Sequence, residues 1–374
     1  MKIIVLGSGV PSVSYPLLGS FAFGQAKELA EDGHDVTYFA LDLRSFFRRR
    51  AFGISNGVES NGLKWYIISI PIGAIPIGLL CRIGGYAFSI LYRRVFKAEK
   101  PDIIHAHFMK IGCMASSLAK KKRIPLIITE HSSIMNRSVL PRGFKKCAEK
   151  AYNNASAVIA VSEKLANNIK ELTGIDCAVI PNMINTSVFS KVDTTEHKGF
   201  RLVTTSNLIP LKRTIDLIKS VELLSTNYPD IYLDIIGDGF LKNELKQYVD
   251  THGLSKRILF HGYLPSEQIA KIYSISDCFA LVSSTETFGV VYVEALASGL
   301  PVIATRCGGP EDFINNNNGL LIEVEDLQAL QSAIIYMYKH ATDYPKETLK
   351  QFAVDSFSPH AIVKRLVSLY QKFI

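Results

Sequence analysis

Two carboxylates eight positions apart are the residues of this sequence best placed to do chemistry. Glu286 lies in a polar run after an apolar stretch, 278–282, that predicts a buried strand, and Glu294 lies inside a segment of helical pattern, 290–297. The loop backbone and the free N–H groups at the start of that helix would form an anion site. Phosphate at the helix start and neutral hydroxyls on the two carboxylates would together suit a sugar nucleotide.

This unit resembles the Glu-x7-Glu signature of retaining glycosyltransferases, in particular of glycosyltransferase family 4, whose members have the two-domain GT-B fold. Other blocks that look like the family's follow in its order and span nearly the whole chain: 101–107, 129–131, 179–182, Lys212, 237–239, 260–263 and 308–311. The resemblance implies a hexosyltransferase that moves a sugar from a nucleotide-diphosphate sugar to a saccharide acceptor, with retention of configuration, in cell-surface polysaccharide biosynthesis.

The resemblance also implies roles for residues of the second half. Glu286 would hold hydroxyls of the transferred sugar as a catalytic residue, and Glu294 would bind the ribose hydroxyls of the nucleotide. The backbone N–H groups of Phe288, Gly289 and Val290 would receive the distal phosphate of the donor.

Lys212 is expected to neutralise the donor diphosphate as a point charge and to stabilise the leaving group. The family has an arginine five positions earlier, where this sequence has Asn207, so Arg213 or a residue of the first domain could complete the diphosphate site. Tyr263 stands where family members recognise the base through the backbone, and Glu311 is expected to line the same donor pocket.

In the first half, His105 and His107 end a predicted strand. We expect these two side chains to point to opposite faces of the sheet, one into the core and one into a ligand cleft, and the resemblance favours His107 as the catalytic one. Glu130 and His131 follow the next strand and could line the acceptor pocket. Gly19, in the loop after the first strand, would allow close backbone approach to the donor phosphates.

No Asp-x-Asp occurs in the chain, although metal-dependent sugar transfer needs oxygen ligands for a divalent ion beside the diphosphate. The sequence therefore predicts an enzyme without metal or cofactor, and a UDP-linked donor is favoured over a GDP-linked one. A nicotinamide-dependent oxidoreductase is the alternative among enzymes. Against it, Gly7 and Gly9 lack the third glycine of a dinucleotide fingerprint.

The chain of 374 residues is too long for one ordinary core, which predicts two domains. Apolar strand patterns alternate with helical patterns in both halves, as is typical of parallel sheets covered by helices on both faces. The expected fold class is α/β, with two doubly wound Rossmann-like domains facing across a cleft. We place an acceptor-binding domain at 1–185, a donor-binding domain at 186–356, and a C-terminal helix at 357–374 that in this family crosses back onto the first domain.

The net charge of +8 is concentrated in the first half, with basic clusters at 48–50, 93–94, 120–123 and 145–146. A polyanionic partner, either nucleic acid or an anionic membrane, is one interpretation, and a solvated basic surface is the other. An apolar segment at 67–91 lies between two clusters, and the uncharged run at its start contains Pro71, Gly73, Pro76 and Gly78. Because prolines break a continuous helix, we expect a hairpin that dips into the headgroup region or a helix packed inside the first domain, rather than a membrane span.

The first residues predict a buried strand rather than a signal peptide. The six scattered cysteines fit a reducing cytosol and indicate neither a disulfide framework nor a zinc site. We therefore expect a cytoplasmic protein, peripheral on the inner face of the cell membrane, with a lipid-linked or polymeric saccharide acceptor and no nucleic-acid partner. A non-enzymatic protein that binds anionic lipid or nucleic acid is the alternative of another class, and it would leave Lys212, Glu286 and Glu294 without a role.

Overall fold

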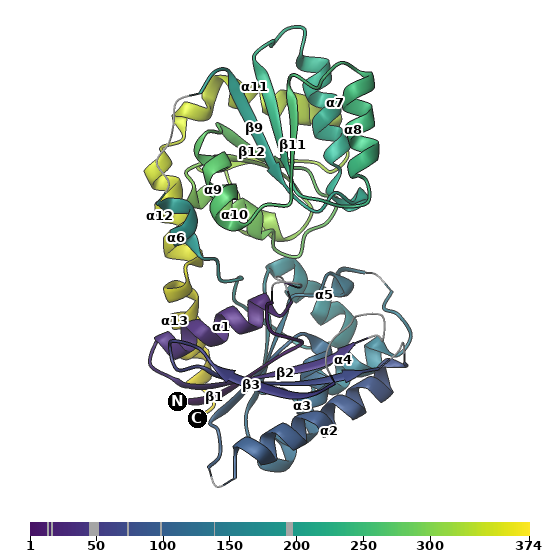
Figure 1. Ribbon diagram of the computed structural model, residues 1–374, viewed down its shortest axis with the longest axis vertical. Helices are drawn as coiled ribbons and strands as arrows, with labels where there is room; N and C mark the ends of the chain where they lie inside the picture. The colour runs from purple at the N-terminus through teal and green to yellow at the C-terminus, as the bar shows by residue number, and fades with distance from the viewer. Residues whose placement is uncertain are drawn as a thin grey trace. The chain divides into compact units, whose positions relative to one another are not determined.

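The computed structural model describes residues 1–12, 15, 18–44, 52–72, 75–97, 99–137, 139–191 and 197–374. They form two compact units: unit 1 contains residues 1–183 and 362–374, and unit 2 contains residues 184–361. Each unit is built on one sheet with helices packed against it (Figure 1). The basic cluster at 48–50 and Gly73 lie outside the described residues.

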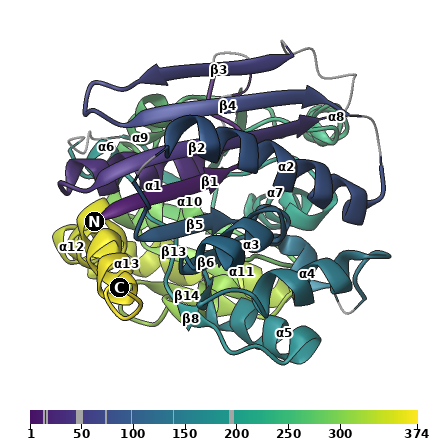
Figure 2. The same cartoon turned by 90° about the horizontal axis from the view of Figure 1, so that it is seen from below.

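Unit 1 contains an eight-stranded sheet in the order β3-β4-β2-β1-β5-β6-β7-β8, which Figure 2 shows from β3 at one edge. Neighbouring strands are parallel except β3 and β4, which are antiparallel. The strands are β1 Lys2–Gly7, β2 Asp35–Arg44, β3 Gly53–Val58, β4 Lys64–Pro71, β5 Ile103–His107, β6 Leu126–Glu130, β7 Ala157–Ala160 and β8 Ala178–Val179. The helices are α1 Ser20–Glu31, α2 Ile77–Val95, α3 Met109–Lys122, α4 Phe144–Tyr152, α5 Glu163–Thr173 and α13 Pro359–Tyr370, with a 3-10 turn η1 at Ser133–Asn136.

The C-terminal helix α13 is part of the core of unit 1. Ile362, Leu366 and Tyr370 of this helix pack in one buried cluster with Ile3 and Val5 of β1 and with α1. Because successive strand residues point to opposite faces, the remaining residues of β1 face the other layer, where α2 and α3 lie.

The apolar segment 67–91 is not a helix hairpin. Its first part is strand β4, which pairs in parallel with β2, and its second part is α2, on which Phe88 contacts Phe39 of β2 with ring centroids 6.0 Å apart. Pro71 ends β4 and Pro76 precedes α2, so both prolines stand at element boundaries, where they interrupt no helical hydrogen bond. No described helix combines the length and the apolar composition needed to cross a membrane.

Unit 2 contains a six-stranded sheet in the order β11-β10-β9-β12-β13-β14, and all of its strand pairs are parallel. The strands are β9 Phe200–Thr205, β10 Ile231–Ile236, β11 Ile258–Gly262, β12 Cys278–Leu281, β13 Val302–Thr305 and β14 Gly319–Ile322. The helices are α6 Thr186–Ser190, α7 Thr214–Leu224, α8 Lys242–Thr251, α9 Ser266–Ser274, α10 Val290–Ala297, α11 Leu327–His340 and α12 Lys346–Phe357, with 3-10 turns η2 Pro210–Lys212, η3 Gly309–Asp312 and η4 Ala341–Asp343.

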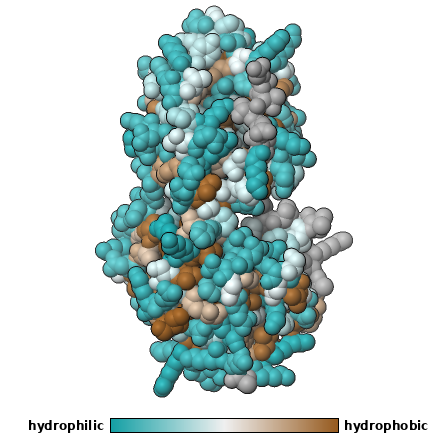
Figure 3. Space-filling model, turned by 90° about the vertical axis from the view of Figure 1, so that its left-hand side faces the viewer, coloured by the Kyte–Doolittle hydropathy of each residue, from teal (hydrophilic) through white to brown (hydrophobic). Residues whose placement is uncertain are grey.

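The strand order of each unit reverses once. In unit 1 the reversal lies at β1, between β2 and β5, and in unit 2 it lies at β9, between β10 and β12. Ligands of doubly wound sheets bind beyond the carboxyl ends of the strands at such a reversal. The two expected Rossmann-like α/β units are thus confirmed, and their reversal points locate the sites described below. On the face shown in Figure 3, hydrophobic residues form separate patches among hydrophilic ones.

Candidate active site

The loops after β9 and β12 bring a lysine and a glutamate together in unit 2. Lys212 ends the 3-10 turn after β9, and its Nζ lies 2.6 Å from Oε1 of Glu286, which lies in the loop after β12. The Ser283 hydroxyl donates to the same Oε1 at 2.7 Å, and the Ser284 N–H donates to the Leu211 carbonyl at 2.8 Å. The charge of Glu286 is therefore balanced by Lys212, and the two loops are joined through the backbone.

Glu294 is a largely buried carboxylate in α10. Burial raises the pKa of Glu294 from 4.5 to about 7, and none of the described residues donates a hydrogen bond to its carboxylate. Its neighbours Val293 and Ala295 are fully buried, so the helix face that carries Glu294 is not an ordinary solvent face. A carboxyl group with a strongly raised pKa and no hydrogen-bond donor is a candidate for ligand binding.

Two glycines give the loop before α10 its shape. Gly289 precedes the helix with φ +92°, in the left-handed region that favours glycine. At Gly309 a Cβ would lie 2.3 Å from the Phe288 Cα, so the loops after β12 and β13 are in direct backbone contact. The Phe288 ring is buried and contacts Phe313 at 5.3 Å between centroids. Phe288 thus leaves its main chain, rather than its ring, for a ligand at the start of α10.

The loop after β13 is tied to the Glu286 loop. The Gly309 N–H donates to the Glu286 carbonyl at 3.1 Å, and the Glu286 N–H donates to the Cys307 carbonyl at 3.1 Å. The Glu311 carboxylate accepts from the Gly308 N–H at 2.9 Å. The exposed Glu311 side chain therefore stabilises its own turn.

The remaining predicted donor residues lie on neighbouring loops of unit 2. Asn207 and Tyr263 are exposed, after β9 and β11 respectively. The Arg213 guanidinium is held by two carboxylates, Asp216 at 2.7 Å and Glu325 at 2.6 Å. Arg213 could bind a diphosphate only after releasing at least one of these partners.

The turn after β10 packs against the loop that carries Asn207, and the sequence did not predict this contact. A Cβ at Gly237 would lie 1.9 Å from the Ser206 carbonyl oxygen, and one at Gly239 would lie 2.4 Å from the Leu208 carbonyl oxygen. Only glycine fits there, which explains the glycines of the block at 237–239.

In unit 1, His105 and His107 point to the same face of the sheet. Their ring centroids are 4.8 Å apart and their planes are inclined by 26°. The expectation that they point to opposite faces is wrong, because residues two apart on a strand lie on one face. Both side chains are buried.

His105 is held entirely by its surroundings. Its Nδ1 lies 2.8 Å from Gln25 Nε2 and 2.5 Å from the Tyr370 hydroxyl of α13, and its Nε2 lies 2.7 Å from the Thr129 hydroxyl. Burial, with a smaller effect of His131, lowers the pKa of His105 to about 3. His105 is thus a neutral structural residue that ties the C-terminal helix to the sheet.

His107 begins a chain of imidazoles that ends on an amide. Its Nδ1 lies 2.9 Å from His131 Nε2, and His131 Nδ1 lies 2.8 Å from Asn182 Oδ1. With the amide oxygen as acceptor, His131 carries its proton on Nδ1 and accepts from His107 Nδ1–H, which leaves a free lone pair on His107 Nε2. That atom is buried and has no partner among the described residues.

Both histidines of this chain are held neutral. Burial lowers the pKa of His131 to about 4, and the hydrogen bond that His131 donates to Asn182 acts in the opposite direction. Burial and the two neighbouring imidazoles hold the pKa of His107 well below its usual range. His107 Nε2 therefore keeps an unused lone pair at neutral pH, on an atom that is shielded from the surface.

Glu130 is fully buried and satisfied by four donors. It accepts from the backbone N–H groups of Met109, His131 and Ser132 and from the Tyr152 hydroxyl, at 2.8–3.0 Å. Its carboxylate therefore positions the segment that carries His131 and does not itself reach a surface.

Gly19 precedes α1 with φ +69°, where a Cβ would lie 2.1 Å from the Gly9 carbonyl oxygen.

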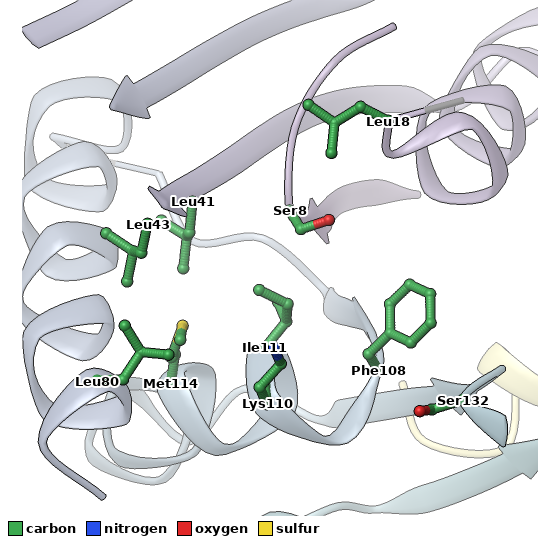
Figure 4. A pocket seen from close by; sticks show the side chains of 10 residues that line it. All are labelled: Ser8, Leu18, Leu41, Leu43, Leu80, Phe108, Lys110, Ile111, Met114 and Ser132. Atoms are coloured by element: carbon green, nitrogen blue, oxygen red, sulfur yellow. The ribbon is translucent and has the colours of Figure 1, made fainter. Parts of the chain in front are cut away.

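A pocket of about 530 Å³ lies in unit 1, and its lining includes Phe108 and Ser132, which directly follow His107 and His131 in the chain (Figure 4). Leucines from β2 and α2 and the side chain of Met114 form its apolar side, and Phe108 lies opposite with the two serines (Figure 4). Phe108 directly follows His107 and has φ +72° and ψ 144°, a conformation that costs a non-glycine residue about 1–3 kcal/mol. The lining residues are Ser8, Leu18, Leu41, Leu43, Leu80, Phe108, Lys110, Ile111, Met114 and Ser132.

Sequence reasoning did not find this pocket, because its lining comes from six separate segments. It also missed Ser283, whose position three residues before Glu286 was the only local signal. Within the described part of unit 2, no three carboxylate, imidazole or thiol groups are close enough to share a metal ion.

Comparisons with known proteins identify the family and agree with the fold. The model of "Glycosyltransferase Family 4" matches residues 18–188, and that of "Glycosyl transferases group 1" matches residues 188–354. A relative from Bacillus subtilis (strain 168), TuaC, named as a teichuronic acid biosynthesis glycosyltransferase, is 33% identical over 371 residues, which cover 91% of this chain and 90% of the relative.

Two solved structures share the fold over the whole chain. Sucrose-phosphate synthase from Thermosynechococcus elongatus superposes with a TM-score of 0.80 at 20% identity and covers 100% of this chain and 99% of its own. HepE from Anabaena, in complex with UDP, superposes with a TM-score of 0.76 at 20% identity and covers 100% of both chains.

Two Rossmann-like units with ligand loops at their strand reversals define the GT-B class of glycosyltransferases. This chain belongs to the group 1 glycosyltransferases of the family 4 type, as the sequence resemblance predicted. It is an enzyme that transfers sugar residues, and neither the non-enzymatic binding protein nor the oxidoreductase is favoured.

Proposed function

We propose that this enzyme transfers a sugar from a UDP-linked donor, with retention of configuration and without a metal ion, to a lipid-linked or polymeric saccharide. The observation that carries the proposal is the Lys212–Glu286 pair, 2.6 Å apart, beside the α10 N-terminus and the unpaired Glu294. One cation, one helix start and two carboxylates are the groups that a nucleotide-diphosphate sugar requires.

Donor binding would exchange partners within this pair. The diphosphate would take the positive charge of Lys212 and the N–H groups of residues 288–290. Glu286 would then be free to accept hydrogen bonds from hydroxyls of the transferred sugar. The ribose hydroxyls would donate to Glu294, whose carboxylate has no other donor among the described residues.

The transfer step would use these groups to stabilise the departing diphosphate. The bond between the anomeric carbon and the phosphate oxygen breaks, and the acceptor oxygen forms its bond on the same face of the sugar. The acceptor proton passes to the departing phosphate oxygen, so the step needs no separate base. Lys212 and the backbone N–H groups act where negative charge develops, which is where such groups accelerate a reaction most.

The choice of UDP is supported by the solved HepE complex, which contains UDP. A polysaccharide acceptor is supported by TuaC, the relative named for teichuronic acid biosynthesis. The apolar pocket of unit 1, with Lys110 on its lining, would suit an acceptor that joins an apolar group to a phosphate. His107 Nε2 is buried, so it would accept a hydrogen bond from a sugar hydroxyl only after the side chains around it move.

We further propose that the enzyme is peripheral on the inner face of an anionic membrane, and that helix α2 makes the contact. Leu79, Tyr86 and Ile90 of α2 are 47%, 70% and 52% exposed. Arg82 and Arg93 are also exposed. They lie on the same face of α2 as these three residues, because each of the five positions follows the previous one by three or four residues. An apolar stripe flanked by arginines is the pattern of a helix that lies in the interface of an anionic bilayer.

A panel of UDP- and GDP-linked sugars tests the proposal when the unfolding temperature of the purified protein is measured with each. We expect one UDP-sugar to raise it most and to be consumed when a saccharide acceptor is added, with an anomeric proton coupling in the product that matches the donor's configuration. Stabilisation by a GDP-sugar alone, or a product of inverted configuration, would contradict the proposal.

A further inference from the structure

Three buried thiols meet between the helices of unit 1. Cys81 lies on α2, Cys113 on α3 and Cys147 on α4, and each side chain is at most 5% exposed. Their sulfur atoms all lie within 4.8 Å of one another, and those of Cys81 and Cys147 are 3.2 Å apart. The cysteines are more than 30 positions apart in the sequence, so their spacing shows no metal-binding motif.

Close packing of α2 against α3 brings these thiols together. A Cβ at Gly84 would lie 2.3 Å from Met114 Sδ, and one at Gly85 would lie 3.2 Å from the Met114 carbonyl oxygen. The two helices can approach only because these positions lack side chains. Cys81 lies one turn before Gly84, and Cys113 is adjacent to Met114, so the close approach places both sulfurs in the seam.

The cluster is reached through a second pocket of unit 1, separate in its lining from the pocket of Figure 4 except for Met114. It has a volume of about 420 Å³, and its lining includes Cys81, Cys113, Met114 and Lys150. Cys81 and Cys113 thus border a space large enough for an ion to enter, and the Cys147 sulfur lies within 4.8 Å of both of their sulfurs. The positive charge of Lys150 would offset part of the negative charge of thiolates.

We propose that Cys81, Cys113 and Cys147 form a thiolate site for a thiophilic d10 metal ion, either Zn2+ or Cu+. At a metal–sulfur distance of about 2.3 Å, three sulfurs around one ion lie about 4 Å from one another. The three sulfurs of the cluster already lie within 4.8 Å of one another, so little movement is needed to bind an ion. Three sulfur ligands without a carboxylate or imidazole select soft ions over Mg2+ or Mn2+. As each metal–sulfur bond forms, the thiol proton passes to solvent.

The ion would clamp α2, α3 and α4 to one another. These helices carry the exposed face of α2 and the pocket residues Leu80, Ile111 and Met114. The site would stabilise unit 1 and is separate from the donor-binding loops of unit 2, which would still work without a metal ion. A disulfide between Cys81 and Cys147 is the competing fate of the same thiols.

The experiment uses the full chain, purified under reductant, stripped with a chelator and desalted. Zn2+ is titrated against a chromophoric chelator and Cu+ against a Cu+-specific chelator, and Cd2+ serves as a probe of thiolate charge-transfer absorption. Cys113→Ala removes one ligand, and Cys278→Ala, at an equally buried cysteine of unit 2, is the matched control. Circular dichroism verifies that each variant is folded.

We expect one equivalent of Zn2+ or Cu+ on the wild type and on Cys278→Ala, with an unfolding temperature that rises on loading. Cys113→Ala should bind the same ion at least about tenfold more weakly and should not gain stability from it.

Two results overturn the proposal: neither ion bound by fully reduced wild type, or binding unchanged in Cys113→Ala. If Cys113→Ala does not fold, the Cd2+ absorption decides on wild type alone, since a three-thiolate site must show it. A thiol count two short in freshly isolated protein, with no metal bound after reduction, would establish the disulfide instead.

Discussion

Replacing Glu294 by glutamine should remove a pH dependence of stability that the structure places on this one side chain. Burial raises the pKa of Glu294 from 4.5 to about 7, so the folded protein holds the proton more tightly than the unfolded chain. The stabilisation is fully present below pH 4.5 and is lost as the pH rises through 7. Each pH unit between the two pKa values corresponds to about 1.4 kcal/mol, which gives an upper limit of about 3 kcal/mol.

Partial exposure of Glu294 brings the expected value below that limit, because solvent screens the charge. Calorimetry of wild type and Glu294→Gln between pH 5 and pH 8 measures the effect. A unit of this size changes its unfolding temperature by about 2–4 °C for each kcal/mol, so the wild type should lose several degrees relative to the variant over this range. Parallel curves for the two proteins would refute the assignment of the raised pKa to Glu294.

The same titration should control donor binding. Ribose hydroxyls donate to a carboxylate better than to a protonated carboxyl group, so UDP binding should expel the proton of Glu294. The quantity to compare is the ratio of UDP affinity at pH 8 to UDP affinity at pH 6. For a pKa of about 7, this ratio should be up to about tenfold larger in wild type than in Glu294→Gln. The variant corrects for the titration of the UDP phosphate itself. Equal pH dependence in both proteins would mean that the nucleotide does not contact Glu294.

Three further predictions concern charge. Lys212→Ala should lower kcat/KM by about 100-fold or more, because the lysine would stabilise the negative charge of the departing diphosphate. Lys219→Ala, on the exposed face of α7, should leave kcat/KM unchanged, and equal effects of the two substitutions would contradict the role of Lys212. Transfer should continue in excess EDTA, and a loss of activity that magnesium or manganese restores would show a metal at the donor site. Sedimentation of the protein with vesicles should require anionic lipid and weaken with salt. It should fall when Arg93 and Arg94 are replaced by glutamate, but not when Lys256 is replaced in the same way. If the wild type sediments with vesicles of no composition, the membrane is removed from the proposal.

Much of the fold could be predicted because its strands are continuously apolar. The runs that form β1, β5 and β12 are too short for helices and are bounded by polar or turn-forming residues, so their type and order follow from the sequence. Strands β3 and β4 were missed for two different reasons. Gly53–Val58 is polar and largely exposed at a sheet edge, and Lys64–Pro71 merges with the apolar start of α2.

The candidate donor site was predictable as far as it depends on strand ends. Lys212 and Glu286 follow strands that turn out to be neighbours, and the structure brings them within 2.6 Å. Contacts that join distant segments left no pattern in the sequence. They include the tie between His105 and Tyr370, the strained backbone of Phe108, the apolar pocket of unit 1 and the three thiols. The orientation of the histidines was predictable from strand geometry alone and was predicted wrongly.

The central claim is that the loops of unit 2 bind a nucleotide diphosphate, and a crystal structure of the protein with UDP tests it most directly. The account predicts the distal phosphate within hydrogen-bond distance of the N–H groups of residues 288–290 and of Lys212 Nζ, with Lys212 no longer 2.6 Å from Glu286. The ribose hydroxyls should contact the Glu294 carboxylate. UDP bound at the turn between β1 and α1, or bound in unit 2 with the Lys212–Glu286 pair intact and Glu294 untouched, would contradict it.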